Sequence, residues 1–587
     1  MGRLLLSGNE AIARAAWEAG AQVGVGYPGT PSTEVLEAFS CLEDVTAQWA
    51  PNEKVALEVA AGISLGGVRV LCAMKHVGMN VAADALMTLA YTGVVGGLVI
   101  LVADDPGMHS SQNEQDSRRW GPFAKVPVFE PSDSADAYAY VIEAFDVSER
   151  FDTPVLVRST TRVSHSKGLV EVGERTEHGS VRYAKRAPKW VMMPAMARAR
   201  RLDVERRTAA LTEYAEKTPL TLEEPGVGAR GVLTAGVAYQ FAREVLPDAP
   251  MLKLALSWPL PEHRISAFAE AVRGLAVVEE LDPYLASSVR SMGIAVDDVA
   301  IPRMGELDPG RLRTAFGLPQ PPTRDAIPDL PPRPPMLCPG CPHRGVFAAL
   351  RSIGAVVTGD IGCYTLAALA PLSAMDTCVC MGASIGMGSG LAQTGAAGDR
   401  PVVAVIGDST FAHSGLTGLL NAVYNGGDVT VVILDNRTTA MTGRQGNPVS
   451  GTLLDGTSAP ALDLEAAARA LGVSSVVRLN PMNLRRTEKV LREETDRPGV
   501  SVVIAESPCA LLVRHDPDAS FAVAMEACTA CGVCVELGCP AITKEASSGK
   551  AIIDAALCVA CTHCVQICAD RAIKPAGPAC ALPEAIA

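Results

Sequence analysis

Cysteines are the residues of this chain best suited to chemistry. The 587 residues include 17 of them. Five lie between residues 338 and 380, and most of the others lie between 509 and 580. A chain expected in the cytoplasm does not use cysteines for disulfides, so such clustering indicates metal ligands.

Two motifs in the C-terminal segment, residues 516–587, repeat one spacing. In each motif, two residues separate successive cysteines in a set of three, and this spacing allows the three thiolates to bind three corners of one [4Fe–4S] cube. In paired motifs, a fourth and more distant cysteine binds the cluster of the other motif. The first cluster is predicted to take Cys528, Cys531, Cys534 and Cys568, and the second Cys558, Cys561, Cys564 and Cys539.

These motifs depart from the usual pattern in two places. Four residues precede Cys539 where three is usual, and Ala569 stands where proline is usual. Neither change removes a ligand. A zinc ribbon is the alternative, but it prefers two CxxC pairs separated by a longer loop. We therefore predict a ferredoxin-like domain with two clusters.

Clusters move electrons and do not choose a substrate, so the chemistry is expected upstream. Residues 402–442 contain an apolar strand that ends at Gly407-Asp408-Ser409 and a second that ends at Asp435-Asn436. Parallel strands end at the same sheet edge, where ligands bind. The Asp408 carboxylate, the Asn436 amide and the Thr438 carbonyl are oxygen ligands suited to Mg2+ and to a diphosphate.

The remaining sequence alternates short apolar runs with helical stretches, which is typical of α/β domains with parallel sheets. Segment boundaries follow changes in this rhythm and a proline-dense stretch. The predicted order is an α/β domain at 1–165, a helical excursion at 166–230, an α/β domain at 231–317, a linker at 318–336, a third α/β domain at 337–515, and the cluster domain at 516–587.

Several motifs together resemble one enzyme family. Residues 402–442 resemble the thiamine-diphosphate motif, GDG followed by about thirty residues and an Asn, with Ser409 in place of the last glycine. YPGTPSTEV at 27–35 resembles the pyrimidine-domain signature of the 2-oxoacid:ferredoxin oxidoreductases, and LEVAAG at 57–62 their activating-glutamate helix. CPGCPHR, GDIGCYTL and CMGASIG complete a resemblance that spans essentially the whole chain.

The resemblance implies roles for individual residues. Residues 1–165 would hold the thiamine pyrimidine, residues 231–317 would be a transketolase-C-like domain, and residues 337–515 would hold the diphosphate and Mg2+. Glu58 would be a buried carboxylate that activates thiamine, with Glu53 as its competitor, and Thr30 would lie near the substrate. Gly407, Asp408, Ser409, Asn436 and Thr438 would bind the cofactor.

A third [4Fe–4S] cluster is also implied by the wider family. Its ligands would be Cys338, Cys341, Cys363 and Cys509. The alternative is a turn rich in proline and glycine that carries free thiols.

The activity implied is oxidative decarboxylation of an aryl 2-oxoacid such as indolepyruvate. Ferredoxin would be reduced, coenzyme A would accept the acyl group, and a beta subunit would complete an alpha2-beta2 heterotetramer. Another 2-oxoacid, pyruvate or phenylglyoxylate, remains an alternative, as do a non-oxidative thiamine decarboxylase and an electron-transfer subunit without thiamine chemistry. His109, Arg118 or Arg119 would contact the substrate carboxylate or have only a surface role.

Charge and hydropathy exclude other classes of protein. The net charge of −13 argues against a nucleic-acid partner. No stretch approaches the ~20 consecutive apolar residues of a membrane span, and the N-terminus turns polar too early for a signal peptide. The basic stretch at 182–207 is interpreted as a solvated helical face or subunit contact, with a docking patch for an acidic electron-transfer protein as the alternative.

Overall fold

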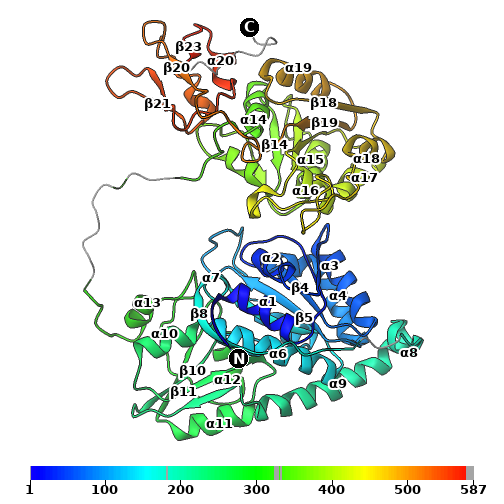
Figure 1. The fold of residues 1–587 in the computed structure, drawn as a ribbon, viewed down its shortest axis with the longest axis vertical. Coiled ribbons are helices and arrows are strands. Elements are labelled where there is room, and N and C mark those ends of the chain that lie inside the picture. The colour runs from blue at the N-terminus through cyan, green and yellow to red at the C-terminus, as the bar shows by residue number, and fades with distance from the viewer. Residues whose placement is uncertain (1, 180–182, 323–329, 331–333, 577–587) are drawn as a thin grey trace. The chain divides into compact units, whose positions relative to one another are not determined.

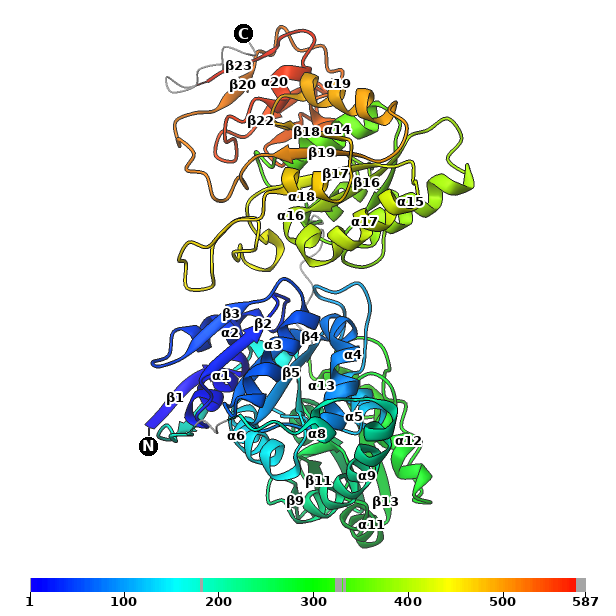
Figure 2. The same cartoon turned by 90° about the vertical axis from the view of Figure 1, so that its right-hand side faces the viewer.

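The computed structural model describes residues 2–179, 183–322, 330 and 334–576. The chain forms two compact units, Met1–Ala326 and Ile327–Ala587 (Figures 1 and 2). Most of the predicted linker at 318–336 lies outside the described residues. Within the described part of the chain, no helix is both long and apolar enough to cross a membrane.

A seven-stranded sheet forms the centre of the first unit, in the order β12-β6-β7-β5-β4-β2-β3. All neighbours are parallel except β12 and β6. Its central strands are buried along their whole length, as expected for a parallel sheet covered on both faces. The strands are β2 (Val23–Gly26), β3 (Thr46–Trp49), β4 (Val70–Lys75), β5 (Leu98–Asp104), β6 (Val128–Phe129), β7 (Val155–Thr160) and β12 (Leu256–Trp258).

Helices cover both faces of this sheet (Figure 1). On one face, the apolar side of α3 packs Ala56, Leu57 and Ala60 into a core with residues of α4 and of the central strands. The Asn52 side chain caps α3 by accepting the Val55 N–H. The principal helices are α1 (Gly8–Glu18), α2 (Thr33–Ser40), α3 (Glu53–Leu65), α4 (His76–Thr92) and α6 (Ser134–Phe151).

The predicted helical excursion at 166–230 begins with a strand instead. Strand β8 (Lys167–Val172) pairs antiparallel with β1 (Gly2–Ser7). In KGLVEV, Val170 and Val172 are buried and alternate with exposed positions, which is the period of a strand and not of a helix. A long helix, α9 (Pro194–Lys217), then follows.

A second sheet in the same unit has the order β13-β10-β11-β9. Its strands are β9 (Leu222–Glu224), β10 (Arg230–Ala235), β11 (Met251–Leu254) and β13 (Gly274–Val278). Strand β12 follows β11 in the chain but joins the larger sheet through β6. The two α/β parts of the first unit are therefore joined by backbone pairing.

The second unit contains a six-stranded, wholly parallel sheet in the order β15-β14-β16-β17-β19-β18. Helices α14 and α19 cover one face, and α15, α17 and α18 cover the other (Figure 1). The strands are β14 (Val356–Gly359), β15 (Thr377–Cys378), β16 (Val402–Gly407), β17 (Thr430–Asp435), β18 (Ser475–Leu479) and β19 (Ser501–Glu506). The helices are α14 (His343–Ser352), α15 (Ala383–Thr394), α17 (Leu416–Tyr424), α18 (Leu464–Ala470) and α19 (Leu484–Thr495).

The tail has little regular structure and a small core of its own. Two short antiparallel pairs frame it, β20 with β23 and β21 with β22. Its buried apolar residues include Phe521, Leu537 and Ile573, together with Cys534 and Cys564. The elements are β20 (Phe521–Val523), β21 (Ile542–Lys544), β22 (Ala551–Ile553), α20 (His563–Ile567) and β23 (Ile573–Pro575).

Candidate active site

The two strand ends predicted to form a cation site do meet in the second unit. β16 and β17 are parallel neighbours, with Gly407 opposite Leu434. Asp408 follows Gly407, is buried, and accepts the Ser409 N–H at 2.7 Å through Oδ1. Its Oδ2 is buried and has no hydrogen-bond partner among the described residues.

The environment of Asp408 disfavours its charged form. Burial, with a smaller contribution from the negative charge of Asp435, raises the pKa of Asp408 to about 8. A buried carboxyl with one uncompensated oxygen is a costly arrangement unless a cation binds there. Asp408 therefore fits a magnesium ligand.

The loop after β17 presents the other predicted ligands. Asn436 and Thr438 are buried, and the Thr438 N–H lies 3.3 Å from Asn436 Oδ1. Arg437, between them, has a left-handed backbone (φ 64°) and forms ion pairs with Asp435 and Glu506. These ion pairs hold the loop at the sheet edge, where its amide and carbonyl oxygens suit Mg2+.

Four thiols from three separate segments gather beside this loop. Burial raises the pKa of Cys341 to about 12, and the nearby Cys338 and Cys363 add to the increase. Burial likewise raises the pKa of Cys363 to about 11, with contributions from Cys509 and Cys338. The Cys509 N–H donates to the Asn436 carbonyl at 3.0 Å, so this thiol set is attached directly to the candidate cation loop.

The tail cysteines form two further groups. Cys531, Cys568 and Cys528 act electrostatically on Cys534, whose pKa is raised first by burial. Cys561, Cys539 and Cys558 act in the same way on Cys564, whose pKa burial also raises. Each group thus contains three closely spaced thiols and the distant thiol of the other motif. Within the described residues, no three His, Cys, Asp or Glu side chains are placed to hold a single metal ion.

Arg344 connects the upstream thiol set to the tail. Its guanidinium is fully buried and donates to the carbonyls of Leu537 and Gly538 at 2.8 and 3.2 Å, and to those of Leu337 and Cys338 at 2.9 and 3.0 Å. A Cβ on Gly340, in the Cys338–Cys341 turn, would lie 3.6 Å from the Cys561 Cβ.

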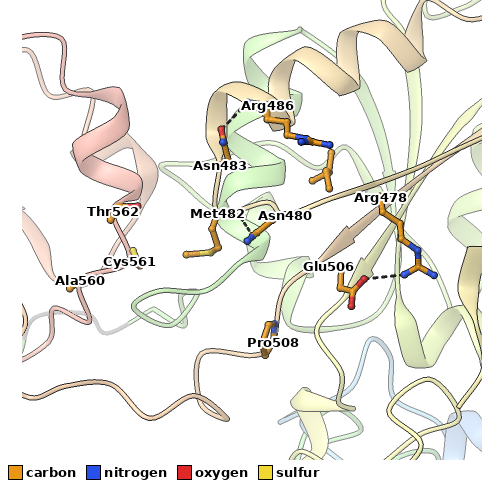
Figure 3. Close-up of a pocket in the computed structure, with 11 residues that line it drawn as sticks. Arg478, Asn480, Met482, Asn483, Arg486, Glu506, Pro508, Ala560, Cys561 and Thr562 are labelled. Carbon is orange, nitrogen blue, oxygen red and sulfur yellow. Dashed lines mark hydrogen bonds and ion pairs between the residues drawn. The ribbon is translucent and has the colours of Figure 1, made fainter. Parts of the chain in front are cut away.

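A pocket of about 770 Å3 opens beside Cys561 (Figure 3). Polar side chains from the end of β18 and the start of α19 line it, among them Asn480 and Arg486. Arg478 points toward Glu506 and is paired with it. Cys561, one of the predicted cluster ligands of the tail, is therefore part of the wall of this pocket.

In the first unit, the prediction that Glu58 is a buried carboxylate is wrong. Its side chain is 47% exposed and pairs with Lys54, one turn earlier. Because Ala56, Leu57 and Ala60 face the sheet, position 58 turns outward.

Glu53, the competitor, is 5% exposed and is the first residue of α3. A Cβ on Gly78 would lie 2.5 Å from Glu53 Oε1, so only glycine allows this approach of α4. Burial raises the pKa of the Cys72 thiol, and the negative charge of Glu53 raises it further. The buried carboxylate of this helix is therefore Glu53.

Thr30 lies half-buried on the loop after β2, and its carbonyl accepts the Ser110 hydroxyl at 3.3 Å. The three candidate carboxylate ligands are all paired otherwise. Arg118 is fully buried between Asp116 and Glu279, while His109 and Arg119 are exposed beside Glu306 and Asp282.

The sequence reasoning missed Lys75, a buried lysine at the end of β4 that bonds to the Ser110 carbonyl. The sequence feature that could have identified this residue is the single charged residue directly after the apolar run VRVLCAM.

Part of the basic stretch at 182–207 has an internal role. Arg200 and Arg207 on α9 donate to the carbonyls of Ala90, Tyr91 and Thr92 at the end of α4, and Lys189 and Arg200 pair with Asp152. The two arginines donate to a helix terminus, because the last carbonyls of α4 need donors. Other basic residues of the stretch, among them Arg198, Arg201 and Arg206, are exposed, so the interpretation of a solvated face or subunit contact stays a prediction for them. Arg182 lies outside the described residues.

Two families define the class of this protein. Residues 14–224 match the family described as pyruvate flavodoxin/ferredoxin oxidoreductase, thiamine diP-bdg. Residues 360–505 match the C-terminal TPP-binding domain of thiamine pyrophosphate enzymes. The protein is a thiamine-diphosphate-dependent oxidoreductase.

Relatives of almost equal length narrow this class. Indolepyruvate oxidoreductase subunit IorA of Archaeoglobus fulgidus is 41% identical over 98% of each chain. The protein of that name in Pyrococcus abyssi is 37% identical over 96% of each chain. The chain belongs to this IorA family of 2-oxoacid:ferredoxin oxidoreductases.

Among solved structures, a 2-oxoglutarate:ferredoxin oxidoreductase from Magnetococcus marinus is 15% identical, covering 49% of this chain and 60% of its own. The TM-score is 0.43.

Proposed function

We propose that this chain is the catalytic alpha subunit of an oxidoreductase that acts on aryl 2-oxoacids, with indolepyruvate as the preferred substrate. The 2-oxoacid anion and coenzyme A give an aryl-acetyl-CoA, CO2 and one proton, and two electrons pass singly to two ferredoxins. The near full-length IorA relatives support the substrate. The structural observation that carries the redox part is the hydrogen bond from Cys509 to the Asn436 loop, because it puts a four-thiol set beside the candidate cofactor loop.

Thiamine diphosphate, when bound, supplies the carbon nucleophile for the keto group. Asp408, Asn436 and the Thr438 carbonyl are proposed to hold Mg2+ and, through it, the diphosphate. Gly407 and Ser409 complete the turn around them. Glu53 replaces Glu58 as the proposed partner of the pyrimidine ring, because a buried carboxyl holds or releases a proton under local control.

Three [4Fe–4S] clusters are proposed. Two take the tail ligands assigned above, and the third takes Cys338, Cys341, Cys363 and Cys509. Arg344 would fix the spacing between the third cluster and the one at Cys561, since its hydrogen bonds span both segments. Electrons would then leave through the ferredoxin-like tail.

The proposed partners are a beta subunit in an alpha2-beta2 assembly, ferredoxin and coenzyme A, in the cytoplasm. IorA is named as a subunit in its relatives, which supports a second chain. The net charge of −13 favours neither nucleic acid nor an acidic membrane surface.

Turnover by the anaerobic complex tests this proposal. The complex should reduce a viologen dye with indolepyruvate and phenylpyruvate, with kcat/KM for pyruvate at least about tenfold lower, which corresponds to about 1.4 kcal/mol of transition-state discrimination. A higher kcat/KM for pyruvate than for indolepyruvate would show that the proposed substrate is wrong. Absence of any dye reduction that depends on a 2-oxoacid would overturn the proposed function.

A further inference from the structure

Lys75 is a buried basic residue at the carboxyl end of a central strand. It ends β4, directly before α4, and is 8% exposed. Its Nζ donates to the Ser110 carbonyl at 2.7 Å and lies 3.4 Å from the Ser110 hydroxyl. Among the described residues, no carboxylate forms an ion pair with Lys75.

Asp105 is the acid that acts on Lys75 electrostatically, but its oxygens are used elsewhere. They accept the Ser110 N–H at 2.8 Å and the hydroxyls of Ser111 and Thr161 at 2.5 and 2.7 Å. Burial lowers the pKa of Lys75 to about 8, only partly offset by Asp105. Buried charges in proteins are normally paired, so a buried lysine with no ion pair among the described residues is suited to bind an anion.

The position of Lys75 agrees with a ligand site. It lies at the carboxyl end of a parallel strand, where such sheets bind ligands. A Cβ on Gly29, in the YPGT loop, would lie 3.1 Å from the Lys75 Cβ. Ser110 links Lys75 to Thr30, because its carbonyl accepts from Lys75 and its hydroxyl donates to the Thr30 carbonyl.

The three basic residues of the 109–119 loop that could bind a carboxylate each lie beside an acidic residue. Arg118 is held by Asp116 and Glu279, and Arg119 by Asp282. His109 lies 3.6 Å from Glu306. Lys75 is thus the buried cation near Thr30 that an incoming carboxylate would neutralise.

We propose that Lys75 binds the carboxylate of the substrate and selects anionic aryl ligands over neutral ones of the same shape. This inference rests on the proposed function, because it takes the substrate to be an aryl 2-oxoacid. Lys75 contacts substrate on this account, whereas a purely structural lysine would only tie the 109–111 loop to β4.

Ligand binding to the complete complex separates these roles. Indole-3-propionate keeps the aryl group and carboxylate of the substrate and lacks the keto group, and indole-3-propionamide is its neutral counterpart. Calorimetry should show affinity for the acid falling about 10- to 100-fold in Lys75→Met, the range for a hydrogen bond to a charged group. Affinity for the amide and for thiamine diphosphate should stay within about twofold of wild type.

Two further variants protect the test from loss of folding. Lys75→Gln keeps a donor for the Ser110 carbonyl without the charge, and is expected to lose the preference for the acid as Lys75→Met does. Lys75→Arg keeps the charge and should retain the preference. Lys54→Met removes an exposed lysine on α3 and is the matched control.

An unchanged preference for the acid in folded Lys75→Met or Lys75→Gln would overturn the inference and leave Lys75 as a loop tie. Failure of the proposed function would look different. The wild-type complex would then bind indole-3-propionate through Lys75, yet reduce no dye with any aryl 2-oxoacid.

Discussion

The two large parallel sheets differ in how many of the buried charges near their carboxyl edges are paired with an opposite charge. In the first unit, Arg158 bonds to Asp104 at 2.7 Å and pairs with Glu130, and Arg118 pairs with Asp116 and Glu279. These ions neutralise one another in the interior. In the second unit, Asp408 is buried with one oxygen lacking any partner among the described residues.

The difference shows which buried charges belong to the fold and which await a ligand. In the first unit each of these buried charges has an opposite charge beside it, although Glu130 Oε2 and Arg158 Nη2 have no hydrogen-bond partner among the described residues. Among the described residues, Asp408 and Lys75 form no ion pair, and the pKa of each is shifted toward the neutral form. Substitutions at the unpaired and the paired groups should therefore differ in their effects, and the largest effect is expected at Asp408.

Replacing Asp408 by alanine should remove thiamine-diphosphate binding in the presence of Mg2+. Because the carboxylate is the only anionic ligand we assign to the metal, affinity should fall more than about 100-fold and activity should disappear. Calorimetric titration measures this. Asp399→Ala, on the exposed turn before β16, should bind as wild type does, and equal binding by both variants would contradict the assignment.

Replacing each of the two glutamates of α3 by glutamine in turn tests whether Glu53 or Glu58 serves the active site. Glu53→Gln should lower kcat by about 100- to 10,000-fold, the usual range for loss of a positioned acid–base group. Glu58→Gln removes only an exposed i,i+4 pair with Lys54 and should change kcat less than about twofold. Steady-state dye reduction compares them, and a larger loss in Glu58→Gln would restore the original assignment.

Iron analysis tests the thiol set beside Asn436. Anaerobically prepared wild type should contain about twelve irons per chain, and Cys341→Ser about eight, because one four-iron cluster loses a ligand. Cys41→Ser, which changes a lone exposed cysteine, is the control. A wild-type value near eight would remove the third cluster and leave the tail clusters untouched.

The affinity of indole-3-propionate should depend on pH through Lys75. The protonated amine binds the anion, and the free amine has a pKa of about 8 with Asp105 and His76 as charged or titratable neighbours. Affinity should therefore be constant between about pH 6 and pH 7 and fall above the pKa, by no more than the 10- to 100-fold lost in Lys75→Met. Titration series in wild type and Lys75→Gln check this, and the same slope in both would exclude Lys75.

The smallest effect is expected on α9. Arg207→Met leaves the buried carbonyls of Ala90 and Asp152 without a donor and should reduce stability by about 1 to 3 kcal/mol. Arg206→Met removes only an exposed pair with Asp203 and should cost less than about 1 kcal/mol. Thermal unfolding midpoints compare the two, and similar shifts would contradict the proposed importance of the Arg207 hydrogen bonds.

Strand ends and repeated spacings were predictable from the sequence because each depends on nearby residues. The strands before Asp408 and Asn436 are β16 and β17, and their parallel pairing follows from two apolar runs joined by a helix. The periodicity of α3 places Glu53 and Glu58 on different sides of the helix. Periodicity does not determine which side of the helix faces the sheet, so the prediction that Glu58 is buried was wrong.

Local order along this chain therefore determined the α/β class, the positions of the main strand ends and the cysteine spacing of the tail. Only the tertiary structure decided which charges are compensated. That property depends on partners brought from distant segments, such as Glu279 to Arg118, or on the absence of one among the described residues, as at Asp408 Oδ2. Coulomb and desolvation energies depend on distance and burial in space, and sequence separation does not measure either.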